Sequence, residues 1–365
     1  MDEPGAGVTL GVKDLFDTAG LTTTYGSAIF GEHVPEQTAE AVARLEAGGY
    51  ATVGKTNLHE FAYGITSENP HFGDVVNPLD ATRYPGGSSG GSAAALAAGL
   101  CDAALGTDSA GSIRIPAACC GIVGFKPTHA LVPMDGCWPL APSWDTGGPM
   151  ARDIAGCVRM MRALDPGFSA KHVALEEPRV AVAWLDDADP GVALRIEEAS
   201  ARFPHRERID FPLMPTNLDP AFWGEVAGVH RELFAEHADL YGENVRAKVE
   251  RAVRVADEDY EAGLQARHRY VNEAADALEG FDLLLVPTIG TVAPPRTIPE
   301  RKLRPPTLRF TEPFNALGWP ALALPCGTAE SGLPASVTLA APQRKDDYVL
   351  GVGEALEAAL ASAST

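Results

Sequence analysis

Two clusters rich in glycine and serine are the part of the chain best suited to chemistry. They are Gly86–Ser92 and Gly106–Arg114, and Ser112 follows Ser88 by 24 positions. Glycines at this density let backbone N–H groups approach a reacting atom closely, and a serine among them can act as a nucleophile. No histidine lies between the clusters. The pattern therefore indicates serine chemistry without a histidine base.

Lys13 is the lysine whose setting best suits a base. It ends the apolar pattern Val8–Lys13, which predicts a strand that carries it into the interior. Burial without a permanent counter-charge lowers the pKa of a lysine and makes the neutral amine available near neutral pH. Asp14 would point to the opposite face of the strand and need not neutralise Lys13. Lys55 is kept as a weaker alternative base, and Lys126 is interpreted as structural.

The elements around the two clusters fit this chemistry. Ser92–Gly99 is rich in alanine and predicts a helix that ends at a glycine, and Leu100–Leu105 predicts a short buried strand. The first cluster would then open a helix, and the second would follow the end of a strand. Strand ends and helix N-termini are where exposed backbone donors collect in sheet-based enzymes.

The rest of the chain predicts an α/β fold. Helical patterns separate the expected strands, which favours a central mixed β-sheet covered by helices on both faces. The expected strands lie near residues 8–12, 51–53, 100–105, 179–184 and 283–286, and consecutive helices with charged faces are expected over 221–279.

Other enzyme classes fit less well. Gly87–Gly91 matches the G-x-S-x-G elbow with Ser89 as nucleophile, but that fold needs a histidine downstream, and the last one, His268, lies in a charged helical segment. Neither cluster is followed by the Lys-Ser or Lys-Thr of a phosphate-binding loop. The six cysteines include no C-x-x-C pair, so no metal site is expected.

The run from Gly86 to Thr128, which ends in the sequence CGIVGFKPT, resembles the amidase signature family. The resemblance continues through Gly54–Asn57, Asn69–Pro78, Pro139–Met150, Leu284–Thr288 and Pro313–Ala321. Members of that family hydrolyse carboxylic amides with a Ser-Ser-Lys triad. The resemblance thus implies the amidase signature fold and an acyl-enzyme mechanism that needs no cofactor.

Carried onto this sequence, the resemblance makes Ser112 the nucleophile, Ser88 the bridging serine and Lys13 the base. In the family the peptide bond before the bridging serine is cis. The oxyanion hole implied by the resemblance consists of the N–H groups of Ser109, Ala110, Gly111 and Ser112.

The resemblance also implies where an acyl group would bind. The segments expected to line the pocket are Phe61–Gly64, Cys137–Pro139 and Phe314–Trp319, and the substrate-binding residues expected are Tyr63, Gly64, Arg114 and Trp138. Because these segments carry no basic side chain, they favour a small or medium neutral amide. Arg114 has a second interpretation, in which it pairs with Asp108 or another carboxylate and braces the loop.

Composition and charge limit the partners and the cellular location that can be expected for the protein. The net charge of −20 argues against nucleic acid and anionic membrane surfaces as partners, and 45% hydrophobic residues can form a large core. Met1-Asp2-Glu3 is unlike the start of a signal peptide, and no apolar run approaches about 18 residues, so a cytoplasmic protein is expected. A small-molecule amide is the expected partner, and a homodimer is left open.

One amidase signature domain is expected over residues 1–365. It would comprise a signature core at about 5–160, a helical cleft-roof region at about 190–279 and a return to the sheet at about 280–360. Family members carry several dozen residues of helix before the lysine strand, and that segment is expected to be missing here or to precede a misassigned start.

Three functions follow from the resemblance. The first is a stand-alone amidase acting on a neutral carboxamide. The second is the glutaminase-type subunit of a tRNA-dependent amidotransferase, for which the sequence offers no recognisable set of glutamine-binding charges. The third is a truncated, inactive family member.

Overall fold

The computed structural model describes residues 5–362, and these form one ten-stranded sheet with the strand order β2-β1-β3-β5-β4-β9-β10-β8-β6-β7. The acidic start Met1–Glu3, used above to argue against a signal peptide, lies outside the described residues. The strands are β1 Thr9–Lys13, β2 Ala51–Thr56, β3 Ala103–Asp108, β4 Val123–Lys126, β5 Thr146–Ala151, β6 Val180–Val182, β7 Arg206–Arg208, β8 Leu283–Pro287, β9 Ala321–Thr328 and β10 Pro334–Ala340.

Helices surround this sheet. They are α1 Glu40–Ala47, α2 Gly90–Ala97, α3 Arg114–Cys120, α4 Ile154–Leu164, α5 Pro190–Ser200, α6 Asp219–His237, α7 Glu243–Ala252, α8 Asp257–Ala277, α9 Glu300–Ala316 and α10 Asp346–Ala361, together with the short 3-10 helices Ala28–Phe30, Glu60–Ala62, Leu185–Asp187, Thr216–Leu218, Ala238–Leu240 and Glu330–Gly332. In the described part of the chain, no helix is long and apolar enough to cross a membrane.

The sheet is mixed, as the sequence predicts. Strand β1 pairs in parallel with β2 and β3, whereas β5 is antiparallel to both β3 and β4. Beyond β4, the strands β9 and β10 run antiparallel to their neighbours, and β6 runs parallel to β8. The α/β fold class is therefore confirmed.

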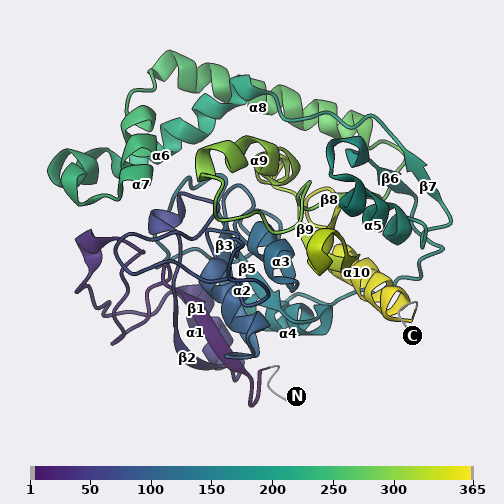
Figure 1. The fold of residues 1–365 in the computed structure, drawn as a ribbon, viewed down its shortest axis with the longest axis horizontal. Coiled ribbons are helices and arrows are strands. Elements are labelled where there is room, and N and C mark those ends of the chain that lie inside the picture. The colour runs from purple at the N-terminus through teal and green to yellow at the C-terminus, as the bar shows by residue number, and fades with distance from the viewer. Residues whose placement is uncertain (1–4, 363–365) are drawn as a thin grey trace.

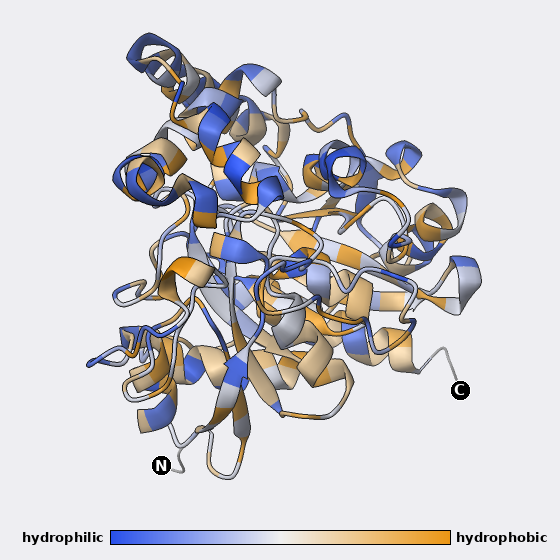
Figure 2. Ribbon diagram, turned by 60° about the vertical axis from the view of Figure 1, so that its left-hand side comes forward, coloured by the Kyte–Doolittle hydropathy of each residue, from blue (hydrophilic) through white to orange (hydrophobic). Residues whose placement is uncertain are grey.

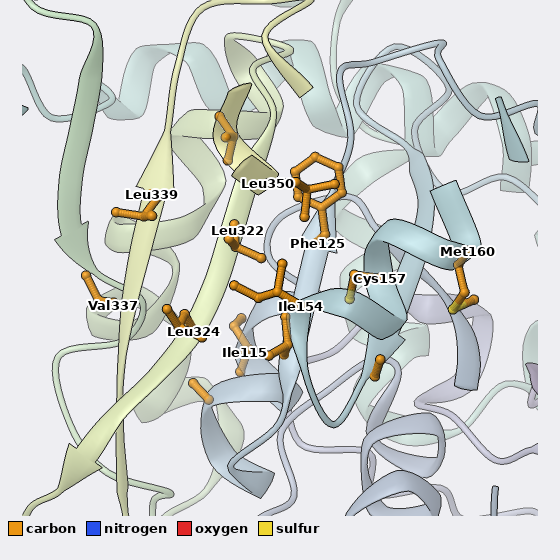
Figure 3. Packing of buried hydrophobic residues seen from close by; sticks show 14 of the residues in the cluster. Ile115, Phe125, Ile154, Cys157, Met160, Leu322, Leu324, Val337, Leu339 and Leu350 are labelled. Atoms are coloured by element: carbon orange, nitrogen blue, oxygen red, sulfur yellow. The ribbon is translucent and has the colours of Figure 1, made fainter. Parts of the chain in front are cut away.

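Helices cover both faces of the sheet. Successive residues of a strand point to opposite faces, so neighbouring residues of one strand pack against different helices. On β9, Leu322 packs with Ile154 of α4 and Leu350 of α10 in one hydrophobic cluster (Figure 3). The next residue, Ala323, belongs instead to a cluster with the small side chains of α2 and α3. Alanine and glycine in α2 let this helix lie close to the sheet.

Helices α6, α7 and α8 form an arch over α9, on the side of the molecule away from the N-terminal end (Figure 1). The arch carries many hydrophilic residues, whereas the strands and helices beneath it are mainly apolar (Figure 2). The charged pattern over 221–279 thus belongs to consecutive helices, as predicted.

The predicted strands all exist, with shifted bounds. The largest shift concerns the strand expected over 100–105, which begins only at Ala103 because Leu100 lies in a turn and is 74% exposed. The strand continues instead to Asp108, into the second cluster. Helix α2 begins at Gly90 in the first cluster, and Gly99 follows it with a positive φ of 72°.

Candidate active site

The side chains of Lys13 and Ser88 meet in the interior. Lys13 Nζ donates a hydrogen bond of 2.7 Å to Ser88 Oγ and another of 2.7 Å to Thr107 Oγ1. Burial lowers the pKa of Lys13 to about 7, although Cys137, Asp108 and Asp145 act in the opposite direction. A lysine with this pKa is a neutral amine in part of the molecules at neutral pH, and a neutral amine can accept a proton from Ser88.

The sheet explains this meeting. Val12 of β1 lies opposite Leu105 of β3 in a parallel pair, so Lys13 and Thr107 emerge together at the carboxyl ends of two adjacent strands. Ligands and reacting groups in α/β folds collect at that edge. Ser88 reaches the same place from the loop before α2, and the Gly87–Ser88 peptide bond is cis.

Ser112 adjoins this pair through the backbone. The N–H group of Ser89 donates to the carbonyl oxygen of Ser112 at 3.2 Å. Ser112 is 5% exposed, whereas Ser88, Ser89 and Lys13 are each 0% exposed. Ser112 Oγ forms no hydrogen bond to any residue between 5 and 362. Of the serines in the two clusters that these contacts bring together, Ser112 is the most exposed.

The loop after β3 is held by Asp108 and Arg114. Arg114 donates from Nε to Asp108 Oδ2 at 3.0 Å and from Nη2 to Oδ1 at 2.9 Å, and both side chains are fully buried. Burial would raise the pKa of Asp108, but the charge and hydrogen bonds of Arg114 outweigh it and lower that pKa to about 2. Asp108 also accepts the N–H of Gly111 at 2.7 Å.

Helix α9 packs directly on this loop. Thr311 Oγ1 donates to the carbonyl oxygen of Ala110 at 2.6 Å, and Asn315 Nδ2 donates to that of Asp108 at 2.8 Å. Gly111 has a φ of +128°, and a Cβ there would lie 2.4 Å from Thr311 Oγ1. Only glycine fits this place without displacing α9.

Comparison with known proteins shows the family of the chain. The sequence pattern of the amidase family matches residues 2–180 and 215–350. The chain belongs to the amidase family. The resemblance drawn from the Gly/Ser clusters is thereby confirmed, and the protein is an enzyme of the class that hydrolyses carbon–nitrogen bonds.

Relatives with known names include subunits A of glutamyl-tRNA(Gln) amidotransferase. That of Thermus thermophilus is 37% identical over 99% of this chain and 86% of its own length, and that of Synechococcus sp. is 33% identical over 98% and 84%. Among solved structures, a crystal structure of an amidase superposes with a TM-score of 0.89 and 34% identity, covering 98% of this chain and 86% of that one.

A second similar solved structure is that of a protein complex. It was described as an unexpected vestigial protein complex that reveals the evolutionary origins of an s-triazine catabolic enzyme, and it superposes with a TM-score of 0.89 at 29% identity, over 97% of this chain and 84% of that one.

The alternative base Lys55 and the lysine interpreted as structural, Lys126, form no hydrogen bond to the serines of the two clusters within residues 5–362. Lys55 donates to Thr23 Oγ1 at 2.8 Å and forms an ion pair of 3.3 Å with Asp14. Asp14 therefore neutralises Lys55. It does not neutralise Lys13, as expected from its place on the opposite face of the strand. Lys126 is fully buried and donates to the carbonyl oxygen of Pro127 at 2.9 Å.

The oxyanion set needs one correction. The N–H of Gly111 is already bound to Asp108, so it does not point at a substrate oxygen. The N–H groups of Ser109, Ala110 and Ser112 donate to no acceptor within residues 5–362. Ser109 contributes a side-chain contact of 2.5 Å to Asp145, whose pKa burial raises to about 6.

The four residues expected to bind substrate, Tyr63, Gly64, Arg114 and Trp138, do not line the cleft between the arch and α9, and their role stays a prediction. Arg114 is fully buried, and its guanidinium group donates hydrogen bonds to Asp108, Thr311 and Asn315. These contacts hold the loop after β3 in place. Gly64 lies against the ring of His59, and Trp138 packs on Tyr25 at 4.8 Å between ring centroids. Tyr63 is 1% exposed. The expected wall Phe314–Trp319 is buried as well.

A cleft with a volume of about 980 Å³ lies between the arch and α9. The sequence analysis missed its charged wall, which comes from α7 and α9, as well as Thr107, Thr311 and Asn315 at the catalytic loop. Thr107 could have been found from the sequence. If the strand that precedes the second cluster pairs in parallel with the Lys13 strand, the carboxyl ends of the two strands, and with them Thr107 and Lys13, lie side by side. No sequence pattern signals Thr311 or Asn315, which come from distant α9.

Replacing Arg114 by methionine is expected to destabilise this amidase by about 3–5 kcal/mol, because Asp108 would remain buried and unpaired. Urea unfolding followed by circular dichroism measures the change. The matched control is Arg152→Met, which removes a 2.7 Å ion pair to Asp102 whose partners are 46% and 48% exposed. That pair should contribute about 1 kcal/mol or less. Equal effects of the two substitutions would contradict the bracing role.

Proposed function

We propose that this protein hydrolyses carboxylic amides through an acyl-enzyme on Ser112, with Ser88 and Lys13 as the proton relay. The observation that carries the proposal is the 2.7 Å hydrogen bond between Ser88 and a buried lysine without a paired carboxylate. In the described part of the chain no carboxylate lies within 4.0 Å of Lys13 Nζ. No paired negative charge therefore holds the lysine in its protonated form.

The proposed reaction conserves every proton. Neutral Lys13 accepts the proton of Ser88 while Ser88 accepts that of Ser112, and Ser112 Oγ forms a bond to the amide carbon. The tetrahedral intermediate collapses as the proton returns along the same relay to the leaving nitrogen, releasing ammonia or an amine. A water molecule then attacks the Ser112 ester with the same base, which yields the carboxylate and restores the serine.

The oxyanion of the intermediate would be held by backbone donors. The N–H groups of Ser109, Ala110 and Ser112 are the donors that the loop leaves without an acceptor among residues 5–362. Loss of one oxyanion donor costs roughly 3–4 kcal/mol of transition-state stabilisation where it has been measured. The Asp108–Arg114 brace keeps these donors in place without touching the substrate.

A second candidate function is the glutaminase-type subunit of a tRNA-dependent amidotransferase. The names of the relatives favour it. The sequence-based preference for neutral acyl groups, in contrast, rested on segments that the structure buries. The experiment below distinguishes a stand-alone amidase from a subunit, and a homodimer remains a prediction.

Release of ammonia by the purified chain from hexanamide, benzamide and glutamine separates these candidates. A stand-alone amidase should turn over simple amides without any added protein. A subunit should act on glutamine and do so much faster when the other amidotransferase subunits of its host are added. An inactive member would hydrolyse none of them under either condition, which would refute the proposal.

A further inference from the structure

The carboxylate of Asp145 lies opposite the start of the loop that follows β3. Strands β3 and β5 are antiparallel, and the last residue pair of their ladder is Asp108 with Thr146. The next residues outward are Ser109 and Asp145. Side chains opposite each other on antiparallel strands lie within reach of one another. The register of the sheet therefore brings Asp145 to Ser109, the first residue of the loop.

Donors from two segments of the chain occupy both oxygens of this carboxylate. Oδ1 of Asp145 accepts a hydrogen bond from Ser109 Oγ at 2.5 Å. Oδ2 accepts the N–H groups of Leu140 at 2.8 Å and Ala141 at 3.0 Å. These three donors are uncharged, and Asp145 is 5% exposed. Asp145 is thus a buried carboxylate that holds two segments together.

The second of these segments, residues 137–141, adjoins the chain just after Lys13. The N–H group of Trp138 donates to the carbonyl oxygen of Leu15, two positions after Lys13, at 2.9 Å. The Asp145 carboxylate therefore ties the loop after β3 to the chain that flanks the proposed base.

Other contacts fix the later part of the loop. Asp108 accepts the N–H groups of Gly111 at 2.7 Å and Ile113 at 3.2 Å. Ser109 Oγ, in contrast, has Asp145 as its one hydrogen-bond partner within residues 5–362. Asp145 thus fixes the Ser109 side chain at the start of the loop.

Asp145 also acts on Lys13 through its charge. Burial lowers the pKa of Lys13 to about 7, and Cys137, Asp108 and Asp145 act in the opposite direction. Burial raises the pKa of Asp145 to about 6, its hydrogen bonds lower this pKa, and the charge of Glu225 on α6 raises it. Asp145 is therefore ionised in most molecules at pH 7 and favours the protonated form of Lys13.

Of the three groups that act on Lys13 in this direction, Asp145 has the charge that no partner offsets. Burial raises the pKa of the Cys137 thiol, so this group is uncharged at neutral pH. Asp108 forms an ion pair of 2.9 Å with Arg114, which offsets its charge. Removal of the Asp145 charge should therefore be felt at Lys13.

We infer that Asp145 is a positioning residue of the proposed reaction, which holds Ser109 at the start of the oxyanion loop and acts by its charge on Lys13. The inference rests on the proposed function, because the loop and the base serve the attack of Ser112 on an amide. Asp145 acts through Ser109 and Lys13 and is not itself a catalytic residue. Misplacing a reacting geometry by 1 Å can lower a rate about 100-fold.

Ser109→Ala tests the link to the loop, because it removes the hydroxyl that binds Asp145 and keeps the backbone N–H group. We expect kcat to fall about tenfold to a hundredfold with little change in KM, since the oxyanion develops only in the transition state. Ser92→Ala is the matched control. Ser92 is also fully buried, and its Oγ lies 2.7 Å from Thr56 Oγ1, away from the oxyanion loop. This variant should keep the wild-type kcat.

Asp145→Asn tests the charge, because it keeps the shape of the side chain. Its amide can still accept the two backbone N–H groups and donate to Ser109 Oγ. Without the negative charge the pKa of Lys13 should fall, so the midpoint of kcat/KM against pH should move below the wild-type value near 7. Nuclear magnetic resonance of isotopically labelled lysine side chains measures the same titration without substrate, and Lys13→Arg identifies the signal.

Asp346→Asn is the matched control for the charge. Asp346 is also 5% exposed, and it accepts hydrogen bonds from the N–H group of Thr128 at 2.7 Å and from its hydroxyl at 2.5 Å. Asp346 is not among the groups that act on Lys13, so this variant should leave the Lys13 midpoint unchanged.

The two measurements separate failure of the inference from failure of the proposed function. A lowered Lys13 midpoint in Asp145→Asn, in a protein that hydrolyses no amide, would refute the proposed reaction and leave the action of Asp145 on Lys13 standing. An unchanged midpoint in Asp145→Asn would overturn the inference. An active enzyme in which Ser109→Ala keeps the wild-type kcat would overturn it as well, and neither result would affect the assignment of Ser112.

Discussion

Ser112→Ala is expected to abolish amide hydrolysis, with kcat falling by about 10⁴-fold or more, as for other nucleophilic serines. The reason is that no other hydroxyl of the two clusters combines exposure with a position beside the lysine-bound serine. The variant should remain folded, because Ser112 Oγ makes no hydrogen bond within residues 5–362. Turnover of the best substrate and thermal unfolding measure the two effects.

Ser89→Ala is the matched control. Ser89 Oγ is buried and donates to the carbonyl oxygen of Thr107 at 3.1 Å, so its loss should cost about 1 kcal/mol of stability and only part of the activity. A dead Ser89→Ala enzyme beside an active Ser112→Ala enzyme would contradict this assignment and favour the nucleophile elbow.

Substitution of Lys13 should have the next largest effect. Lys13→Met removes the base and should lower kcat by about 10³-fold or more. Lys13→Arg is the sharper variant, because a guanidinium keeps the charge and the donors but does not lose its proton in proteins. Both variants should therefore be inactive if Lys13 acts as a base, whereas an active Lys13→Arg enzyme would show that the lysine only donates hydrogen bonds.

The pH dependence follows from the same residue. Below pH 7 Lys13 holds its proton and cannot accept that of Ser88, while above pH 7 the neutral amine can. The rate constant kcat/KM should thus rise with a midpoint near 7 and stay high into the alkaline range. Asp145 ionises near pH 6, one unit lower, so a profile from pH 5 to 10 separates the two groups. A falling rate above pH 7 would contradict a lysine base.

The segments that carry the proposed triad could be singled out from the sequence more readily than the elements around them. Lys13, Ser88 and Ser112 lie in short segments whose glycines and strand pattern determine their local geometry, and the structure brings these segments together. Arg114 was left between a brace and a substrate contact, and only its distant partners Thr311 and Asn315 explain its position. Such contacts depend on packing between segments about 200 residues apart, which no local pattern contains.

Some elements of the fold could not be predicted from local sequence patterns either. Apolar strands such as β8, Leu283–Pro287, were predicted, while β5 was not, because Thr146–Ala151 contains two glycines and a proline that disfavour strands. Helix α9 was missed as well, since Pro305, Pro306 and Pro313 lie inside it. The cleft wall on α9 was missed for this reason, while Phe314 on the same helix is buried. The expected acyl-pocket segments stay a prediction.

The central claim is that Ser112 forms the covalent intermediate, and labelling with an alkyl fluorophosphonate tests it most directly. Trypsin releases residues 84–114 as one peptide that holds Ser88, Ser89, Ser92, Ser109 and Ser112, so fragment ions must locate the label. We predict one phosphonyl group on Ser112, absent from Ser112→Ala and Lys13→Arg and retained in Ser89→Ala. A label on Ser89, or equal labelling of the wild type and Ser112→Ala, would contradict the account.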